Sequence, residues 1–304
     1  MESELLDIPI QARICYEKNK GLILPDKVPY IGMGASYFAA LTLRYLGVKI
    51  FPEMAGEYFN YVRNVKQFDS AVLISQSGRT TDVLNCAPCF KEFVAVVNDI
   101  NAPLANQPNT KLVVPIYAGK EWFSSTKTFI NTLVALYLGH GFDIRDTLDY
   151  LEHHFPEIEA RGYSLGELLL KNIRKHKARC IILGNGPNVG VAHQAALMLS
   201  EMVKYPFTGM SLTQYEHGYK ESAGNSIVIV INPKKSVMHQ RTSKLIDLLK
   251  IVGSWVIEVK DDEVDELFSP FISILPFFFM ADYLIEKLGI TAPFLVGNKI
   301  TERF

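Results

Sequence analysis

Two parts of the chain repeat one pattern, a buried strand that ends in glycines and leads into a helix, and this repetition constrains the fold more than any other feature. The stretch VPYIGMG (28–34) is matched by RCIILGNG (179–186), and SAVLIS (70–75) is matched by SIVIVIN (226–232). Strands that are apolar along their whole length and alternate with helices are typical of a parallel sheet covered on both faces. The sequence therefore predicts an α/β protein with two duplicated, doubly wound (flavodoxin-like) parallel-sheet subdomains.

A more charged stretch, residues 143–164, separates the two copies and is predicted to be a helical linker. The predicted domains are therefore 1–142 and 165–304. Only the first copy carries SQSG, whereas the second has NPKK at the same point of the pattern. We therefore expect the two copies to have different roles.

The charge balance argues against some classes of function. Lys plus Arg is 31 and Asp plus Glu is 32, which gives a net charge of -1. Such a balance disfavours nucleic-acid binding and electrostatic docking to a membrane. The most apolar segment, 271–285, holds Pro276 and Asp282 and is too short for a membrane span, so it is predicted to be a buried helix. No secretory leader is visible, and we expect a cytoplasmic protein that needs no metal and no cofactor.

The motif ISQSGRTTDV (74–83) concentrates small polar residues where a strand passes into a helix. Ligands of open α/β sheets bind at the carboxyl ends of strands, and the free N–H groups of a helix start favour phosphate. An ordinary helix cap is the alternative, because Ser and Thr are favoured there, but one capping residue would suffice. The density of donors favours a phosphate site, formed by Ser75, Gln76, Ser77 and Thr80 around Gly78.

Two further motifs leave other chemistries open. The glycine pairs in GMGAS and GNGPNVG stand where a dinucleotide fingerprint would, and Glu53 follows the first pair at the distance of a ribose-binding acid. GMGASY lacks the third glycine, so tight turns beside a ligand are the favoured interpretation. Cys86 and Cys89 in CAPC fit a redox or metal motif. No second cluster completes a tetrahedral site, so structural cysteines in a helix kinked at Pro88 are favoured.

Glu201, His217 and Lys299 are each ordinary when taken alone. Glu201 stands in an apolar helix, where a carboxylate costs free energy unless it is paired or functional. His217 stands beside Gly218 in a polar loop, and Lys299 lies near the end of the chain. None of the three identifies a catalytic site by itself.

Together, these motifs make nearly the whole chain resemble the double-SIS (sugar isomerase) family, and specifically the isomerase half of the glucosamine-6-phosphate synthases (glutamine–fructose-6-phosphate aminotransferases). The resemblance is carried by GMGAS, EMAGEY, LISQSGRTTD, SSTKTF, ALMLSE, EHG and the lysine-containing tail. Its most specific parts are the serine-rich loop, the STK stretch and the spacing of Glu201 and His217.

The resemblance implies a role for each candidate residue. The 6-phosphate of a sugar would be held by Ser36, Ser75, Gln76, Ser77 and Thr80. Ser125 would line the sugar site, and Glu201 would move a proton between C1 and C2. His217 would open the pyranose ring from a neighbouring subunit, and Lys299 would form a Schiff base with the C2 ketone. The implied assembly is a homodimer with a shared active site.

Three departures from the family pattern bear on the substrate. Arg79 stands where the synthases have glutamate, Gln194 stands where a second helix glutamate is expected, and FLVGNK (294–299) replaces the usual tail. No nucleophilic cysteine follows Met1, so we expect no glutaminase domain and no ammonia drawn from glutamine.

The predicted function is that of a phosphosugar isomerase or deaminase acting on an amino-sugar 6-phosphate. It would interconvert glucosamine 6-phosphate with fructose 6-phosphate plus ammonia, as an isomerase, a deaminase or an aminotransferase-type enzyme. A fructosamine-6-phosphate deglycase and a non-catalytic sugar-phosphate-binding regulator are the alternatives. The joint presence of Glu201, His217 and Lys299 favours an enzyme, and no helix-turn-helix region supports a transcriptional role.

Overall fold

The computed structural model describes residues 2–176, 179–261, 263–292 and 294–297. These residues form two compact units. The first unit is Leu6–Leu148 together with 294–297, and the second is 149–292 together with 2–5. The boundary at 148/149 falls inside the predicted linker 143–164, but neither unit is contiguous in sequence as the predicted domains are.

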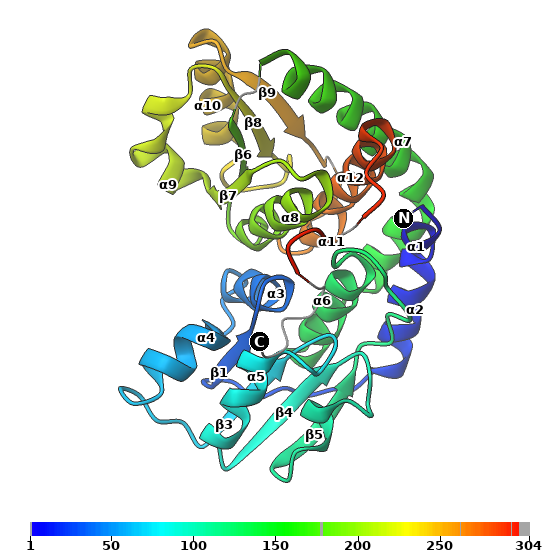
Figure 1. Ribbon diagram of the computed structural model, residues 1–304, viewed down its shortest axis with the longest axis vertical. Coiled ribbons are helices and arrows are strands. Elements are labelled where there is room, and N and C mark those ends of the chain that lie inside the picture. The colour runs from blue at the N-terminus through cyan, green and yellow to red at the C-terminus, as the bar shows by residue number, and fades with distance from the viewer. Residues whose placement is uncertain (1, 177–178, 262, 293, 298–304) are drawn as a thin grey trace. The chain divides into compact units, whose positions relative to one another are not determined.

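The first unit contains a five-stranded sheet in which every neighbouring pair of strands is parallel (Figure 1). Its strands follow the order β2-β1-β3-β4-β5. They are β1 (Pro29–Gly32), β2 (Phe51–Met54), β3 (Ser70–Ile74), β4 (Glu92–Val97) and β5 (Thr110–Pro115). This is the doubly wound order, and the chain reverses direction across the sheet between β1 and β3.

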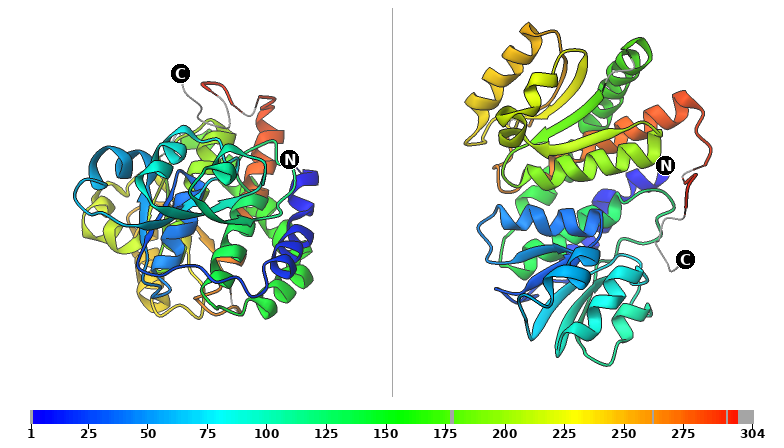
Figure 2. Two further views of the ribbon diagram at one scale, coloured as in Figure 1. Left: turned by 90° about the horizontal axis from the view of Figure 1, so that it is seen from below. Right: turned by 60° about the vertical axis from the view of Figure 1, so that its left-hand side comes forward.

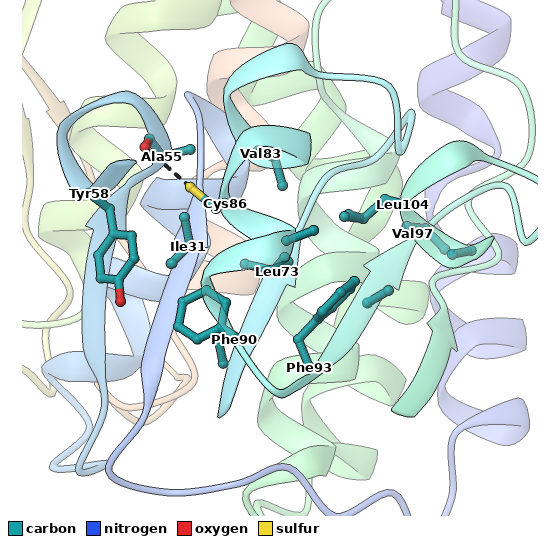
Figure 3. Close-up of a cluster of buried hydrophobic side chains, with 14 residues drawn as sticks. Ile31, Ala55, Tyr58, Leu73, Val83, Cys86, Phe90, Phe93, Val97 and Leu104 are labelled. Atoms are coloured by element: carbon teal, nitrogen blue, oxygen red, sulfur yellow. Dashed lines mark hydrogen bonds between the residues drawn. The ribbon is translucent and has the colours of Figure 1, made fainter. Parts of the chain in front are cut away.

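Helices cover both faces of this sheet (Figures 1 and 2). They are α2 (Ile8–Lys18), α3 (Ala35–Arg44), α4 (Ala55–Glu57) with a π-helical turn (Tyr58–Val62), α5 (Thr81–Cys86) and α6 (Lys127–Gly139). Ile31, Leu73 and Phe93 pack with Val83 of α5 in one buried cluster (Figure 3). The next residue along, such as Val72, points to the opposite face and is also buried. Burial on both faces explains why these strands are apolar throughout.

The second unit contains a four-stranded parallel sheet with the order β7-β6-β8-β9. Its strands are β6 (Arg179–Gly184), β7 (Phe207–Ser211), β8 (Ser226–Ile231) and β9 (Trp255–Val259). Its helices are α8 (Asn188–Val203), α9 (Leu212–His217), α10 (His239–Ile251), α11 (Pro270–Ser273) and α12 (Leu275–Leu288). The first four positions of the first sheet recur here in the same order, so the predicted duplication is confirmed.

The segments outside the two repeats are mostly helical. α1 (Glu2–Leu6) lies at the start of the described chain, and α7 (Arg145–His176) is one helix that contains Pro156 and the predicted linker from residue 145 onward. Short 3-10 turns occupy Ala87–Cys89, Pro103–Asn106 and Tyr219–Ser222. In the part of the chain that the structure describes, no helix is long and apolar enough to cross a membrane.

One local prediction is wrong. The sequence predicted a continuous helix through Cys86 and Cys89 with a kink at Pro88, but α5 ends at Cys86 and a 3-10 turn follows. Proline lacks an N–H, so residue 88 cannot donate the i→i−4 hydrogen bond that would continue the helix. Cys86 is buried and its Sγ donates to the Ala55 carbonyl at 3.4 Å, as the structural interpretation expects.

Candidate functional site

The candidate site begins at the carboxyl ends of β1 and β3, the point where the strand order of the first sheet reverses. Ligands of doubly wound sheets bind outside this switch point. Gly34, at φ 50°, turns the chain from β1 into α3, which puts the half-buried Ser36 in the first turn of that helix. The loop 75–80 leaves β3 beside it, because β1 and β3 are hydrogen-bonded neighbours.

Ser75 braces the loop that follows β3. Its Oγ accepts the backbone N–H of Gly78 at 3.1 Å and lies 3.1 Å from Thr80 Oγ1. Gly78 has φ 61°, and a Cβ added to it would lie 2.5 Å from the Cβ of Ala102. Only glycine fits both the left-handed backbone and this close approach. Ser75 is itself buried, so its hydroxyl is committed to fixing the loop.

Ser77 and Gln76 lie further out on the same loop and are half-buried. Ser77 Oγ accepts the N–H of Arg79 at 3.2 Å, and within the described part of the chain no group accepts the Ser77 hydroxyl proton. The Gln76 carbonyl accepts the N–H of Asn98 at 2.9 Å, which ties the loop to the end of β4. The loop thus presents a free hydroxyl proton, an exposed Arg79 and the first N–H groups of α5.

A cavity of about 580 Å³ lies at the carboxyl ends of β4 and β5. Gln11, Asn98, Asp99 and Tyr117 are among its lining residues. Since Asn98 also holds the loop carbonyl of Gln76, the cavity borders the serine loop. It offers space at the β4 and β5 strand ends, on one side of the β1/β3 switch point, for a group larger than a phosphate.

Ser125 lies in the loop between β5 and α6, and its Oγ lies 2.6 Å from Thr128 Oγ1. Thr128 is held in turn by the buried carboxylate of Glu121, whose Oε2 accepts its hydroxyl at 2.7 Å. Glu121 Oε1 also accepts the N–H and the hydroxyl of Thr126, at 2.8 and 3.0 Å. A carboxylate at a helix start is favoured by the helix dipole and satisfies unpaired N–H groups.

Glu121 was not identified from the sequence. Its signal is present, since an acid stands four residues before the STK stretch that opens α6. Lys127 of that stretch is buried, and its Nζ lies 3.4 Å from Asp7 Oδ2. The STK motif is therefore fixed from both sides within the first unit.

The second unit carries Glu201 and His217. Glu201 lies near the carboxyl end of α8 and is half-buried, and its backbone carbonyl accepts from Lys204 Nζ. His217 is the last residue of α9 and is exposed. The adjacent Glu216 is held by Arg241, with Oε2 2.6 Å from Nη2. Gln194, on the same helix as Glu201, is fully buried. Lys299 lies outside the described residues.

Glu53, the acid at the position of a ribose-binding residue in a dinucleotide site, lies on β2, the edge strand next to β1. Burial raises the pKa of the Glu53 carboxyl, and Arg44 and Lys66 oppose that rise. Among the described residues, no group of three or more His, Cys, Asp or Glu side chains could hold a metal ion.

The structure thus gathers one part of the predicted site in each unit. The five predicted phosphate-binding residues lie at adjacent strand ends of the first unit, and Ser125 belongs to that unit as well. Glu201 and His217 both belong to the second unit.

Curated relatives of this chain are glutamine–fructose-6-phosphate aminotransferases. The protein from Sulfolobus acidocaldarius is 30% identical over 235 residues, which are 72% of this chain and 38% of that protein. The protein from Thermococcus kodakarensis is 27% identical over 302 residues, 87% of this chain and 50% of that protein. The chain therefore spans half or less of these relatives. No family model matches the chain.

Solved structures agree over almost the full chain. A glucosamine-6-phosphate deaminase from Thermotoga maritima superposes with a TM-score of 0.78 at 20% identity, covering 99% of both chains. The C-terminal domain of a glucosamine–fructose-6-phosphate aminotransferase from Francisella tularensis gives 0.77 at 18% identity, covering 94% of this chain and 95% of that one. These likenesses establish the fold.

The chain has the double-SIS fold of the phosphosugar isomerases, with two parallel-sheet α/β units. Within that class it resembles the isomerase half of the glutamine–fructose-6-phosphate aminotransferases.

Proposed function

We propose that the protein is a phosphosugar isomerase or deaminase that acts on an amino-sugar 6-phosphate. The single observation that carries the proposal is the loop 75–80 at the switch point. There, Ser75 and Gly78 fix the backbone while the Ser77 hydroxyl proton has no acceptor among the described residues. A phosphate oxygen would accept that proton, and the start of α5 would supply N–H groups.

Proton transfer is assigned to the second unit. In the reaction proposed, Glu201 removes a proton from one of the two adjacent sugar carbons and returns it to the other, so its own charge is restored at the end. A carboxylate suits this task when its pKa is close to the working pH. His217 would transfer the proton needed to open the sugar ring, from the partner subunit of a homodimer, because imidazole changes charge near neutral pH.

Lys299 is assigned the covalent step. Its neutral amine would add to the C2 ketone of fructose 6-phosphate. Loss of water from the adduct would then give an imine. The imine withdraws electrons from C1 and so stabilises the intermediate left by proton removal. In the deaminating direction, Glu201 would first move the C2 proton of open-chain glucosamine 6-phosphate to C1, which converts the C1 aldehyde and C2 amine into a C1 alcohol and a C2 imine. The Lys299 amine would then add to C2 and ammonia would leave, and water would hydrolyse the resulting lysine imine to free fructose 6-phosphate.

Ammonia release from the purified protein is the direct test. Glucosamine 6-phosphate, a fructosamine 6-phosphate and unphosphorylated glucosamine would be supplied in parallel. Release from the first and not from the third supports the proposal, whereas release only from the second identifies a deglycase. Borohydride added with fructose 6-phosphate should trap a secondary amine on Lys299. If the protein binds the sugar tightly but shows no turnover and forms no adduct, the enzyme interpretation is wrong and the protein is a sugar-phosphate-binding regulator.

A further inference from the structure

The second unit has a switch point of its own, at the carboxyl ends of β6 and β8. β6 is followed by Gly186, whose φ of 50° equals that of Gly34 after β1. β8 is followed by the loop 232–238, which leads into the thirteen-residue helix α10. The N–H of Asn232 donates to the Val259 carbonyl at 2.9 Å, just as Ser75 donates to Val96 at 3.0 Å.

A serine turn recurs in this loop although the SQSG motif does not. Ser236 Oγ accepts the N–H of Met238 at 3.1 Å, two residues on. Ser77 Oγ accepts the N–H of Arg79, also two residues on, in the first unit. Both turns stand immediately before a helix, so each serine hydroxyl is left with its proton to donate outward.

The two serines differ in what receives that proton. The Ser236 hydroxyl donates to Glu266 Oε1 at 2.5 Å, and the N–H of Val237 donates to Glu266 Oε2 at 3.0 Å. A Cβ added to Gly186 would lie 3.6 Å from Glu266 Oε1, so the carboxylate also borders the loop after β6. A hydroxyl and a backbone N–H, both from the loop that precedes α10, therefore hold a carboxylate at the second switch point.

We propose that these groups form an oxyanion-binding cradle in the second unit and that Glu266 fills it. The cradle consists of Gly186, Ser236, Val237 and the start of α10. Its ligand class is a tetrahedral oxyanion such as phosphate, the class assigned to the first unit. The same loop carries Lys234 and Lys235, and Lys235 Nζ donates to the Glu263 carbonyl. The carboxylate on β9, Glu258, is paired with Lys260 at 3.2 Å.

Glu266 acts in this cradle as an internal ligand. Its carboxylate is delivered by the same chain, so a free anion must compete with a tethered one that binds at a high effective concentration. The duplicated site is consequently closed, and a single sugar phosphate binds per chain. Removing the carboxylate opens the cradle without touching the first unit.

Glu266→Ala and Glu266→Ser in the full-length protein test this directly, with inorganic phosphate as the probe. The ¹⁵N-labelled amide of Val237 reports the second unit, and that of Arg79 reports the first. We expect phosphate to shift the Val237 amide saturably in both variants, with an affinity at least tenfold tighter than any response in the wild type. Unchanged amide resonances in β8 show that the variants remain folded.

Three controls separate the cradle from a general change of charge. Glu263→Ala removes a carboxylate from the same segment and should leave Val237 unresponsive. Glu266→Gln keeps an oxygen that accepts from Ser236 and should leave the cradle closed. Adding Ser236→Ala to Glu266→Ala should abolish the gain. The proposal is overturned if Val237 stays unresponsive in folded Glu266→Ala and Glu266→Ser, or responds as strongly in Glu263→Ala.

Discussion

Each unit has its own parallel sheet, and the two sheets have the same order in their first four positions. The units differ in the loops at the carboxyl ends of the strands. In both, a glycine at φ 50° follows the strand that comes first in the chain (β1 or β6). A serine turn precedes the helix that follows β3 or β8. In the first unit the serine proton lacks a described acceptor, whereas in the second it goes to Glu266. Duplication has thus kept the scaffold, and the two copies differ in the groups at the carboxyl ends of their strands, which is the difference that the proposed function uses.

The largest effect is expected from a change in the second unit that should abolish the proposed proton transfer and leave sugar-phosphate binding, assigned to the first unit, intact. Glu201→Gln keeps the shape of the side chain and removes the base. We expect solvent deuterium exchange at C1 or C2 of the bound sugar to fall by about 10²- to 10⁴-fold, with affinity for fructose 6-phosphate retained. Exchange is measured by NMR and affinity by calorimetry. Exchange at the wild-type rate would place the base elsewhere.

A change in the first unit should instead weaken sugar-phosphate binding. Ser77→Ala with Thr80→Ala removes two hydroxyls, and hydrogen bonds to a charged phosphate contribute about 1.5–3 kcal/mol each. We expect affinity for fructose 6-phosphate to fall at least about tenfold. Ser236→Ala is the matched control in the second unit and should leave that affinity unchanged. Equal affinity in the double variant and the wild type would remove the phosphate from this loop.

Much of this division could be predicted from the sequence because it depends on local patterns. Continuous apolar runs identified β3 and β8, and the cluster of hydroxyls after β3 identified the loop. β7 was not predicted, because it is a partly exposed edge strand whose sequence, FTGMS, is short and contains glycine. Its place in the sheet is decided by pairing with β6 rather than by its own residues.

The interactions that complete each site come from residues outside the predicted motifs. Glu121 supports the STK stretch only because the loop after β5 folds back on the start of α6. Glu266 lies thirty positions beyond Ser236 in sequence, and only the fold brings the two together. No spacing rule links a pair so far apart, whereas Glu121 stands four residues before the STK stretch and could have been found from the sequence.

A smaller effect should follow from the backbone of the serine loop. Gly78→Ala introduces a left-handed alanine, which costs about 1–2 kcal/mol, and forces a contact of 2.5 Å with Ala102, which adds about 1–3 kcal/mol. Gly253 in the second unit has φ 86° with nothing within 4 Å of an added Cβ. Gly253→Ala should therefore lower the free energy of unfolding by less. Urea titration compares the two, and equal losses would contradict the packing constraint at Gly78.

The smallest expected effect concerns a half-buried histidine in each unit. Burial lowers the pKa of His140 in the first unit and of His193 in the second. Asp26 opposes this lowering of the His140 pKa, since its Oδ1 lies 3.3 Å from His140 Nδ1. His140 Nε2 lies 2.8 Å from the Tyr30 hydroxyl. The pKa of a histidine in the unfolded chain is about 6.5.

Because each folded pKa is below that value, the unfolded chain takes up the proton first as the pH falls. The free energy of unfolding should therefore decrease below about pH 6.5 and level off once the folded histidine is also protonated. His140→Asn should flatten part of this decrease between pH 7 and 5, measured by urea titration. Asp26→Asn removes the carboxylate that favours the charged ring, so the pKa of His140 should fall further and the decrease should extend to lower pH. If His140→Asn keeps the wild-type pH dependence while His193→Asn loses it, the histidine of the second unit alone accounts for the effect.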